Sequence, residues 1–290
     1  MKSKILSLIT IFCIYALAFG AAAAFLLFFP RPLHPLAALF FADVIATMVV
    51  FIFNVILKNA SIYDPYWSVQ PIFIIFAMYG RFELTFQLFH LIALIPLAAW
   101  SVRLTINWAI GFENMYWEDW RYRDIKKRFP RLSQLIIFTG IMMMPTCLVF
   151  MGIIPLWYFF QIDKIKLVFP LMGGLVILLG TIIELIADTQ MHRFKKNPNC
   201  VQPYIDYGLW RYSRHPNYLG EIFIWLGIFI IGLANFTIQN LAGILSMIFL
   251  FTVISIPLME RHLLEKYPEY SVYQKTVMPL VFGPRKKNKA

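Results

Sequence analysis

The segment YSRHPNYLGE, residues 212–221, places several polar groups directly before a long apolar run. Pro216 suits the first turn of a helix, because the N–H that it lacks has no partner there anyway. Arg211, Arg214 and His215 precede that turn. A helix start offers free N–H groups and a positive dipole end, and arginine adds a bidentate fork for phosphate. The segment therefore predicts an anion clamp at the mouth of a membrane helix.

The same segment carries a second polar pair. Asn217 and Glu221 are spaced i, i+4, so an amide and a carboxylate share one helix face just inside the membrane. An alternative reading is an interfacial anchor, in which Trp210, Tyr212 and Tyr218 grip lipid headgroups. That alternative explains the aromatic residues but not the asparagine–glutamate pair, which we expect to face a cavity.

Ionisable residues inside apolar segments are costly and indicate function by default. Five qualify: Asp43, His90, Arg103, Glu184 and Asp188. Glu184 and Asp188 share a helix face, so their carboxylates repel unless a cofactor, or the nearby Arg193 and Lys195, donates to them. A helix-end salt-bridge cluster is the structural alternative. Asp43 and His90 also fit simple pairing with a neighbouring helix.

Three further elements carry weaker signals. In SIYDPYWSVQP, residues 61–71, Asp64 before a proline marks a turn or a helix start that could meet substrate at bilayer depth. In NMYWEDWRYRDIKKRF, residues 114–129, charges of alternating sign predict a solvated interfacial helix. In residues 256–279 the aromatic spacing predicts an amphipathic helix on the membrane surface, with Glu260 left as a candidate at the edge of a span.

The elements that must position these groups are membrane helices. Hydrophobic residues make up 60% of the 290 residues and charged residues 14%, against about 25% in soluble domains. The sequence contains eight apolar segments, which are 5–29, 35–57, 69–79, 84–108, 132–160, 167–187, 219–236 and 241–258. The first is too long for a signal-peptide core and predicts an uncleaved span. The third, with 11 residues, either is lengthened by residues 62–68 or is re-entrant.

Basic residues predict the orientation. With eight spans, one side collects Lys2, Lys4, Lys58, six cations in 109–131, five in 188–218 and seven in 259–290. The other side collects only four, so the positive-inside rule places both termini in the cytoplasm. The net charge of +11 then needs no nucleic-acid partner. The three cysteines show neither a disulfide framework nor metal-ligand spacing.

The order of these motifs resembles the membrane family related to steroid 5-alpha-reductases. GLWRYSRHPNYLGE before an apolar span, ADTQMHRFK about twenty residues upstream, and the DPYWS, EDWRYR and IPLMERH elements carry the resemblance over roughly residues 40–282. It implies an all-α, polytopic bundle of about seven to eight spans that binds NADPH from the cytoplasm beneath an apolar substrate cavity. We divide the chain into an N-terminal span, 1–34, and a reductase-like domain with a basic tail, 35–290.

The resemblance also implies roles for residues. Asn217 and Glu221 match the asparagine and glutamate of SGANFLGE in steroid reductases, which contact the cofactor, and Asp188 matches an upstream aspartate. Glu184 and Glu260 stand where the family has other residues, which puts steroid itself in doubt as the substrate. The expected cofactor-binding set is Glu184, Asp188, Arg193, Lys195, Arg211, Arg214, His215, Asn217, Tyr218, Glu221 and Glu260.

The expected activity is NADPH-dependent reduction of a C=C bond conjugated to a carbonyl in a steroid-like or isoprenoid lipid. Asp64 and Tyr66 are the candidate catalytic acids, because either could hydrogen-bond the carbonyl oxygen. A SAM-dependent methyltransferase of the isoprenylcysteine type shares the RHPxY pattern and is the first alternative. A non-enzymatic lipid-binding membrane protein is the second. The membrane is the cytoplasmic membrane of a bacterium or the endoplasmic reticulum of a eukaryote, and the oligomeric state is unknown.

Overall fold

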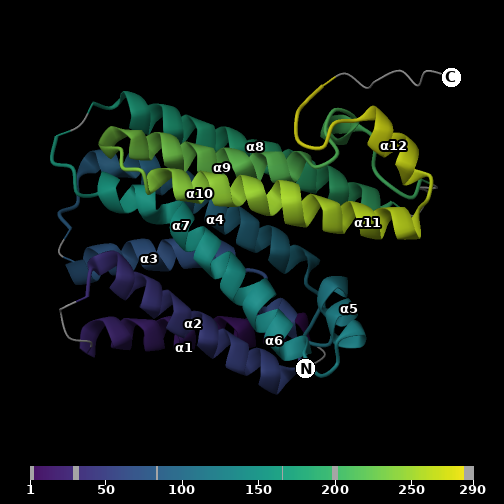
Figure 1. Ribbon diagram of the computed structural model, residues 1–290, viewed down its shortest axis with the longest axis horizontal. Helices are drawn as coiled ribbons and strands as arrows, with labels where there is room; N and C mark the ends of the chain where they lie inside the picture. Colours follow the sequence, from purple (N-terminus) through teal and green to yellow (C-terminus); the bar gives the residue numbers. More distant parts are fainter. Residues whose placement is uncertain (1–2, 29–32, 83, 165, 198–201, 284–290) are drawn as a thin grey trace.

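Long apolar helices run side by side along one direction in the computed structural model, which describes residues 3–28, 33–82, 84–164, 166–197 and 202–283 (Figure 1). These residues form helices and no strand. Seven helical segments are long and apolar enough to cross a membrane: α1 (Lys4–Phe28), α2 (Pro35–Leu57), η2–α4 (Leu88–Gly111), α6–η3–α7 (Ser133–Phe159), α8 (Val168–Lys196), α9–η5 (Pro216–Asn235) and α10–η6–α11 (Asn240–Lys266). The chain is an integral membrane protein, as its composition predicts.

The short third apolar segment is longer in the structure than in the sequence analysis. It forms α3 (Tyr66–Phe82), 17 residues preceded by a 3-10 turn, η1 (Ala60–Tyr63). At 1.5 Å per residue the helix is about 25 Å long, and it runs alongside α2 and α4 (Figure 1). The chain therefore passes from end to end at α3 as well, which agrees with lengthening and not with a re-entrant piece.

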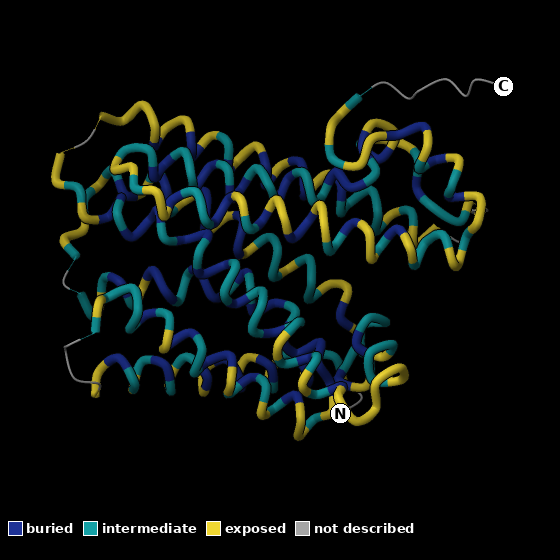
Figure 2. The backbone as a smooth tube through the Cα atoms, viewed as in Figure 1, coloured by how far each residue is buried: buried dark blue, intermediate teal, exposed yellow. Residues whose placement is uncertain are grey.

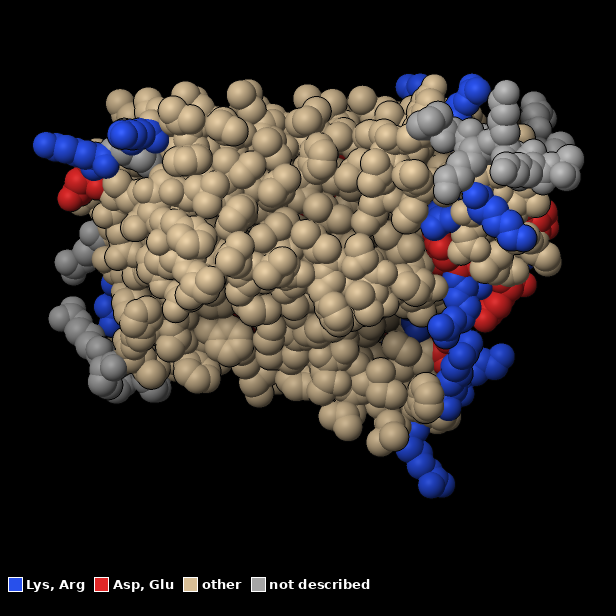
Figure 3. Space-filling view, turned by 45° about the horizontal axis from the view of Figure 1, so that its top comes forward, with Lys and Arg blue, Asp and Glu red and all other residues tan. Residues whose placement is uncertain are grey.

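One end of the molecule carries most of the charge. The short helices α5 (Trp120–Arg128), η4 (Gly208–Arg211) and α12 (Tyr270–Thr276) lie there with the start of α1 (Figure 1). Lys and Arg side chains gather at this end (Figure 3). The basic tail expected at 284–290 lies outside the described residues. We call this the charged end.

The sides of the bundle are apolar. Exposed residues line the outward faces of the outer helices (Figure 2), and they include Phe12, Phe76 and Leu175, which are 74%, 73% and 66% exposed. A soluble protein rarely presents so much contiguous apolar surface. These faces are therefore the ones that contact lipid.

Glycines bring α8 and α9 into backbone contact. Gly173 and Gly180 on α8 face Gly227 and Gly220 on α9, and the two glycines of each helix are seven positions apart. A Cβ atom at Gly173 would lie 2.4 Å from the Gly227 carbonyl oxygen, and one at Gly180 would lie 2.5 Å from that of Gly220. Small residues at such crossings allow close helix packing in membranes. The crossing sets Glu184 directly against Gly220, because a Cβ there would lie 2.5 Å from the Glu184 Cγ.

Two of the long helices widen into π turns near the charged end. These are η3 (Ile137–Met143) and η6 (Leu250–Ser255), and each is followed two residues later by a proline, Pro145 or Pro257. A proline in a helix lacks an N–H and its ring clashes with the carbonyl four residues before it. The wider turn relieves this: the Met144 N–H donates to the Thr139 carbonyl, and the Ile256 N–H to that of Phe251, both five residues back.

Candidate functional site

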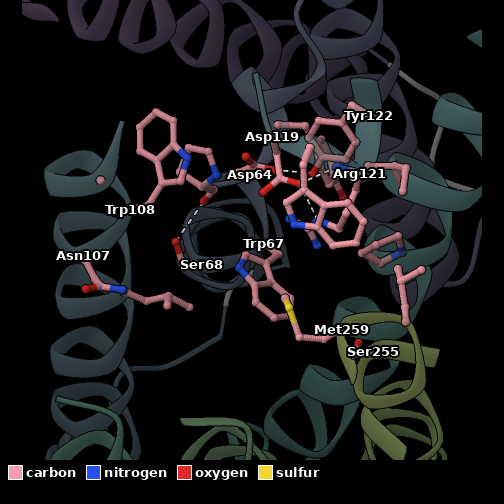
Figure 4. Close-up of a pocket in the computed structure, with 18 of the residues that line it drawn as sticks. Asp64, Trp67, Ser68, Asn107, Trp108, Asp119, Arg121, Tyr122, Ser255 and Met259 are labelled. Atoms are coloured by element: carbon pink, nitrogen blue, oxygen red, sulfur yellow. Dashed lines mark hydrogen bonds and ion pairs between the residues drawn. The ribbon is translucent and has the colours of Figure 1, made fainter. Parts of the chain in front are cut away.

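A cavity of about 560 Å³ lies at the charged end, between the start of α3, the end of α4, α5, η3 and η6 (Figure 4). Nine aromatic residues contribute to its walls, and they are Tyr63, Trp67, Trp108, Phe112, Trp117, Trp120, Tyr122, Tyr218 and Phe251. Its volume, and its combination of aromatic and polar groups, are typical of a small-molecule site. Cations at its wall are Arg121 and Lys195, and His192 also lines it.

The polar centre of the wall is the pair Asp64 and Tyr122. The Tyr122 hydroxyl donates to Asp64 Oδ1, and both residues line the cavity (Figure 4). Desolvation raises the pKa of Asp64 to about 6, because the Arg121 charge and the Tyr122 hydroxyl offset only part of the cost of burial. Burial also raises the pKa of Tyr122 well above its ordinary value. The pair is therefore an acid that can hold a proton near neutral pH.

The loop before α5 is held in place by the turn before α3, although about 58 residues separate them. Asn59 Nδ2 donates to the carbonyls of Met115 and Trp117, each at 2.8 Å. The Ala60 N–H donates to Glu118 Oε1 at 2.7 Å, and the Asp119 N–H donates to Ser61 Oγ at 2.9 Å. These bonds satisfy backbone groups at both turns and fix the distance between Asp64 and α5.

Asp119 gives α5 its direction into the cavity. Its side chain caps the helix by accepting from the Arg121 N–H at 2.9 Å, as aspartate does at many helix starts. The same oxygen accepts from Arg121 Nε at 2.8 Å, which holds the guanidinium at the cavity wall. The expectation of a solvated interfacial helix for this segment therefore misses its inward face, which lines the cavity.

A carboxylate cluster lies deeper, where α4, α8 and α9 meet. Arg103 bonds Glu184 through one guanidinium nitrogen and Asp188 through the other, the latter at 2.6 Å. Glu221 accepts from the indole N–H groups of Trp100 at 3.0 Å and Trp225 at 3.2 Å. Buried charges persist only when they are paired in this way. Arg103, and not the expected Arg193 or Lys195, is the partner of the two α8 carboxylates.

The expected anion clamp has partners inside the chain. Arg214 Nε lies 2.8 Å and His215 Nε2 2.9 Å from Glu260 Oε1. The N–H groups of Arg214 and His215 donate to the carbonyls of Met278 at 2.9 Å and Pro279 at 3.0 Å. Glu260 and the C-terminal segment therefore bond the Arg214 and His215 groups that we expected to bind phosphate.

The remaining expected residues divide between the cavity and the surface. Tyr218 and Lys195 line the cavity, and the Tyr218 ring stacks on that of His215. Arg193 and Arg211 are exposed. The Asn217 Oδ1 atom is buried and has no hydrogen-bond partner in the protein. Such an atom is rare in native proteins and is suited to a donor from a ligand.

Tyr66 differs from its expected position. It is fully buried and donates to Asp43 Oδ1 at 2.8 Å, and it is not among the residues that line the cavity. Gln70 Nε2 donates to the other oxygen of Asp43 at 2.5 Å. Both carboxylate oxygens of Asp43 therefore accept hydrogen bonds from a neighbouring helix, as the alternative of simple pairing predicts. The tyrosine whose hydroxyl bonds Asp64 at the cavity wall is Tyr122, which lies in the EDWRYR element.

Comparison with known proteins gives the family. A family model described as a protein of unknown function, DUF1295, matches residues 50–277. The chain belongs to this family. An uncharacterized protein of Schizosaccharomyces pombe is 26% identical over 263 residues, which cover 76% of this chain and 72% of that relative. No solved structure matches the chain.

The DUF1295 match contains the whole candidate site. It begins inside α2 and ends just after α12, so it includes the cavity, the carboxylate cluster and the Arg214–Glu260 pair. Helix α1 lies outside the match, although it packs along α2. The matched region therefore includes every element that forms the cavity.

Proposed function

We propose that this DUF1295 protein is an NADPH-dependent reductase of a C=C bond conjugated to a carbonyl, acting on a steroid-like or isoprenoid lipid. The observation that carries the proposal is the Asp64–Tyr122 acid pair in the wall of a cavity rich in aromatic residues, at the charged end of a membrane bundle. The apolar part of the cavity wall suits a lipid, and a hydrogen-bond donor beside Asp64 suits the carbonyl oxygen of that lipid.

The residues around the cavity fit a nicotinamide cofactor. Lys195 and Arg121 line the cavity and are cations suited to phosphate groups. Asn217 is not among the lining residues, but its buried, unpartnered Oδ1 can accept from a carboxamide. Glu184 and Asp188 can accept from ribose hydroxyls only if they share or exchange their bonds with Arg103. When bound, NADPH supplies a hydride.

The chain's own contribution is to hold and direct a proton. When Asp64 is protonated, its O–H donates to the Tyr122 oxygen, and the tyrosine proton becomes free to bond a substrate carbonyl. That hydrogen bond stabilises the negative charge that develops on the oxygen as the β-carbon is reduced.

Ligand-dependent thermal stability of the purified protein tests the proposal. A ligand that binds only the folded state at one hundred times its dissociation constant stabilises it by about 2.7 kcal/mol. We expect NADPH to raise the melting temperature in detergent and S-adenosylmethionine to leave it unchanged. Stabilisation by S-adenosylmethionine alone would favour methyl transfer, and stabilisation by neither would favour a lipid-binding role without catalysis.

A further inference from the structure

One side of the cavity is formed by the two π segments. Gly140 and Ile141 of η3 line it, as do Phe251, Ile254 and Ser255 of η6. Helices α7 and α10 pack together at the end away from the charges and diverge toward the charged end (Figure 1). At that end α6 connects to α5, and α11 connects to α12. The two π segments therefore lie on opposite rims of the cavity, where the two helices have separated.

These rims lie inside two of the helical segments that are long and apolar enough to cross a membrane. Segment η3 begins four residues after Ser133, the first residue of its span, and η6 ends eleven residues before Lys266, the last of its span. At 1.5 Å per residue these separations are about 6 Å and about 16 Å. Residues beside the rims are apolar and outward-facing: Leu135 is 59% exposed and Val253 is 55% exposed. This outward side is therefore apolar and suited to contact with acyl chains.

The rim formed by η3 is open at Gly140. A Cβ atom built there meets no atom within 4 Å, although the residue lines the cavity. The packed glycines of α8 and α9 have a steric reason to lack a side chain, whereas Gly140 has none from its own neighbours. The missing side chain leaves free space at the lipid-facing wall.

We infer that the cavity opens sideways into the bilayer between η3 and η6 and takes an amphiphilic lipid through this opening. The oxygen-bearing head of the lipid reaches Asp64 and Tyr122, and its apolar tail remains between the two π segments and in the bilayer. The position of the head rests on the proposed function, whereas the lateral opening rests on the rims alone. A lipid with a long tail is therefore a better substrate than a compact, water-soluble enone.

Tryptophan quenching by bilayer lipids tests the opening without any substrate or cofactor. Trp67 lines the cavity, and its ring centroid lies 6.5 Å from that of Phe251 on η6. The protein is placed in vesicles of phosphatidylcholine with brominated acyl chains, and the Trp67 signal is taken as the difference from a Trp67→Phe variant. We expect brominated chains to quench Trp67 in the wild-type protein and Gly140→Leu to remove that quenching.

Two glycines give matched controls. Gly111 also lines the cavity, and a Cβ built there meets no atom within 4 Å, but it lies at the end of α4 at the charged end. A Cβ built at Gly80, near the end of α3, also meets no atom within 4 Å, and Gly80 does not line the cavity. Gly111→Leu and Gly80→Leu should leave Trp67 quenched. Gly140→Met serves as a second plug if the leucine variant does not fold.

The result can overturn the inference in three ways. These are an unquenched Trp67 in the wild-type protein, unchanged quenching in folded Gly140→Leu and Gly140→Met, or loss of quenching in Gly111→Leu alone. None of these outcomes depends on NADPH, so failure of the lateral opening is distinguishable from failure of the reductase proposal.

Discussion

Asp64 is the residue whose charge couples the candidate site to the stability of the fold. Its pKa is raised from 3.8 to about 6 by desolvation, so the folded state binds its proton more tightly than the unfolded state does. Stability then falls as the pH rises from about 4 to about 6, and the full cost of the buried carboxylate is present above that range. The acid that the proposed reaction needs is thus maintained at a cost in folding stability.

We therefore expect Asp64→Asn to raise the melting temperature at pH 8 and to have little effect at pH 4.5. Asparagine keeps the size and can still accept from Tyr122, but it carries no charge to desolvate. Each kcal/mol removed corresponds to about 2–4 °C for a chain of moderate length. Melting curves in one detergent at both pH values measure the effect. Equal destabilisation at both values would show that the carboxylate is favourably paired and not strained.

Tyr122→Phe separates chemistry from binding. The variant keeps the aromatic wall but removes the hydroxyl that is proposed to bond the substrate carbonyl. We expect the rate of NADPH oxidation with an enone lipid to fall about 10²–10⁴-fold, the usual contribution of a positioned acid. Stabilisation by NADPH should remain. Wild-type activity should also decline as the pH rises above about 6, because Asp64 then loses its proton.

Tyr66→Phe is the matched control for that experiment. Its hydroxyl bonds Asp43 and does not reach the cavity, so its loss should lower stability while activity per folded molecule is retained. If Tyr66→Phe and not Tyr122→Phe abolished turnover, the sequence-based choice of Tyr66 would be restored and the role of Tyr122 withdrawn.

At the scale of elements, the α8–α9 crossing joins the fold to the carboxylate cluster. We expect Gly220→Ala to destabilise the protein by about 1–3 kcal/mol, the usual cost of overpacking, because its Cβ would lie 2.5 Å from Glu184 Cγ and 2.7 Å from the Gly180 carbonyl oxygen. The displaced crossing should also weaken NADPH binding. Gly80→Ala, which meets nothing within 4 Å, should be neutral or slightly stabilising. Melting temperatures of the two variants with and without NADPH check both statements, and equal behaviour of the two would show that the crossing yields easily.

The sequence predicts the helices better than it predicts how they meet. Apolar run lengths are enough to place the seven long spans, because a bilayer demands about twenty apolar residues per helix, but not to decide how the 11-residue run at 69–79 lies. Pro145 and Pro257 indicate in the sequence that the helix is disturbed near the two π turns. A proline in a span does not, however, show whether the helix avoids the clash by a π turn or in another way. The partners of buried charges have no local signal: Arg103 and Glu184 are 81 residues apart, and Arg214 and Glu260 are 46 apart. A charge pattern read along one segment therefore shows that a partner is required but not which residue supplies it.

The charge at one end of the whole molecule makes a prediction about orientation. In the structure Lys4 at the start of α1 donates to the Ile110 carbonyl at the end of α4, so the first helix begins at the end where α5 and α12 lie. That end carries the basic residues of α5 and the last turn of α8, while the opposite end carries few (Figure 3). From the positive-inside rule we therefore predict that the charged end, with the start of α1 and the end of α12, faces the cytoplasm.

Reporter fusions test this assignment and the route of the cofactor together. Fusions after Lys58, Gly111, Lys196 and Ala290 should all report the cytoplasm, and one after Asp163, at the other end of α7, should not. The cavity lies at the charged end, so cytoplasmic NADPH reaches it only in this orientation. Reversing the charges of Lys126, Lys127 and Arg128 should weaken the bias without touching the cavity wall, since these residues do not line it. A signal from the opposite compartment at Lys196 would contradict the topology, and it would leave the proposed reductase facing a side of the membrane from which cytoplasmic NADPH cannot reach it.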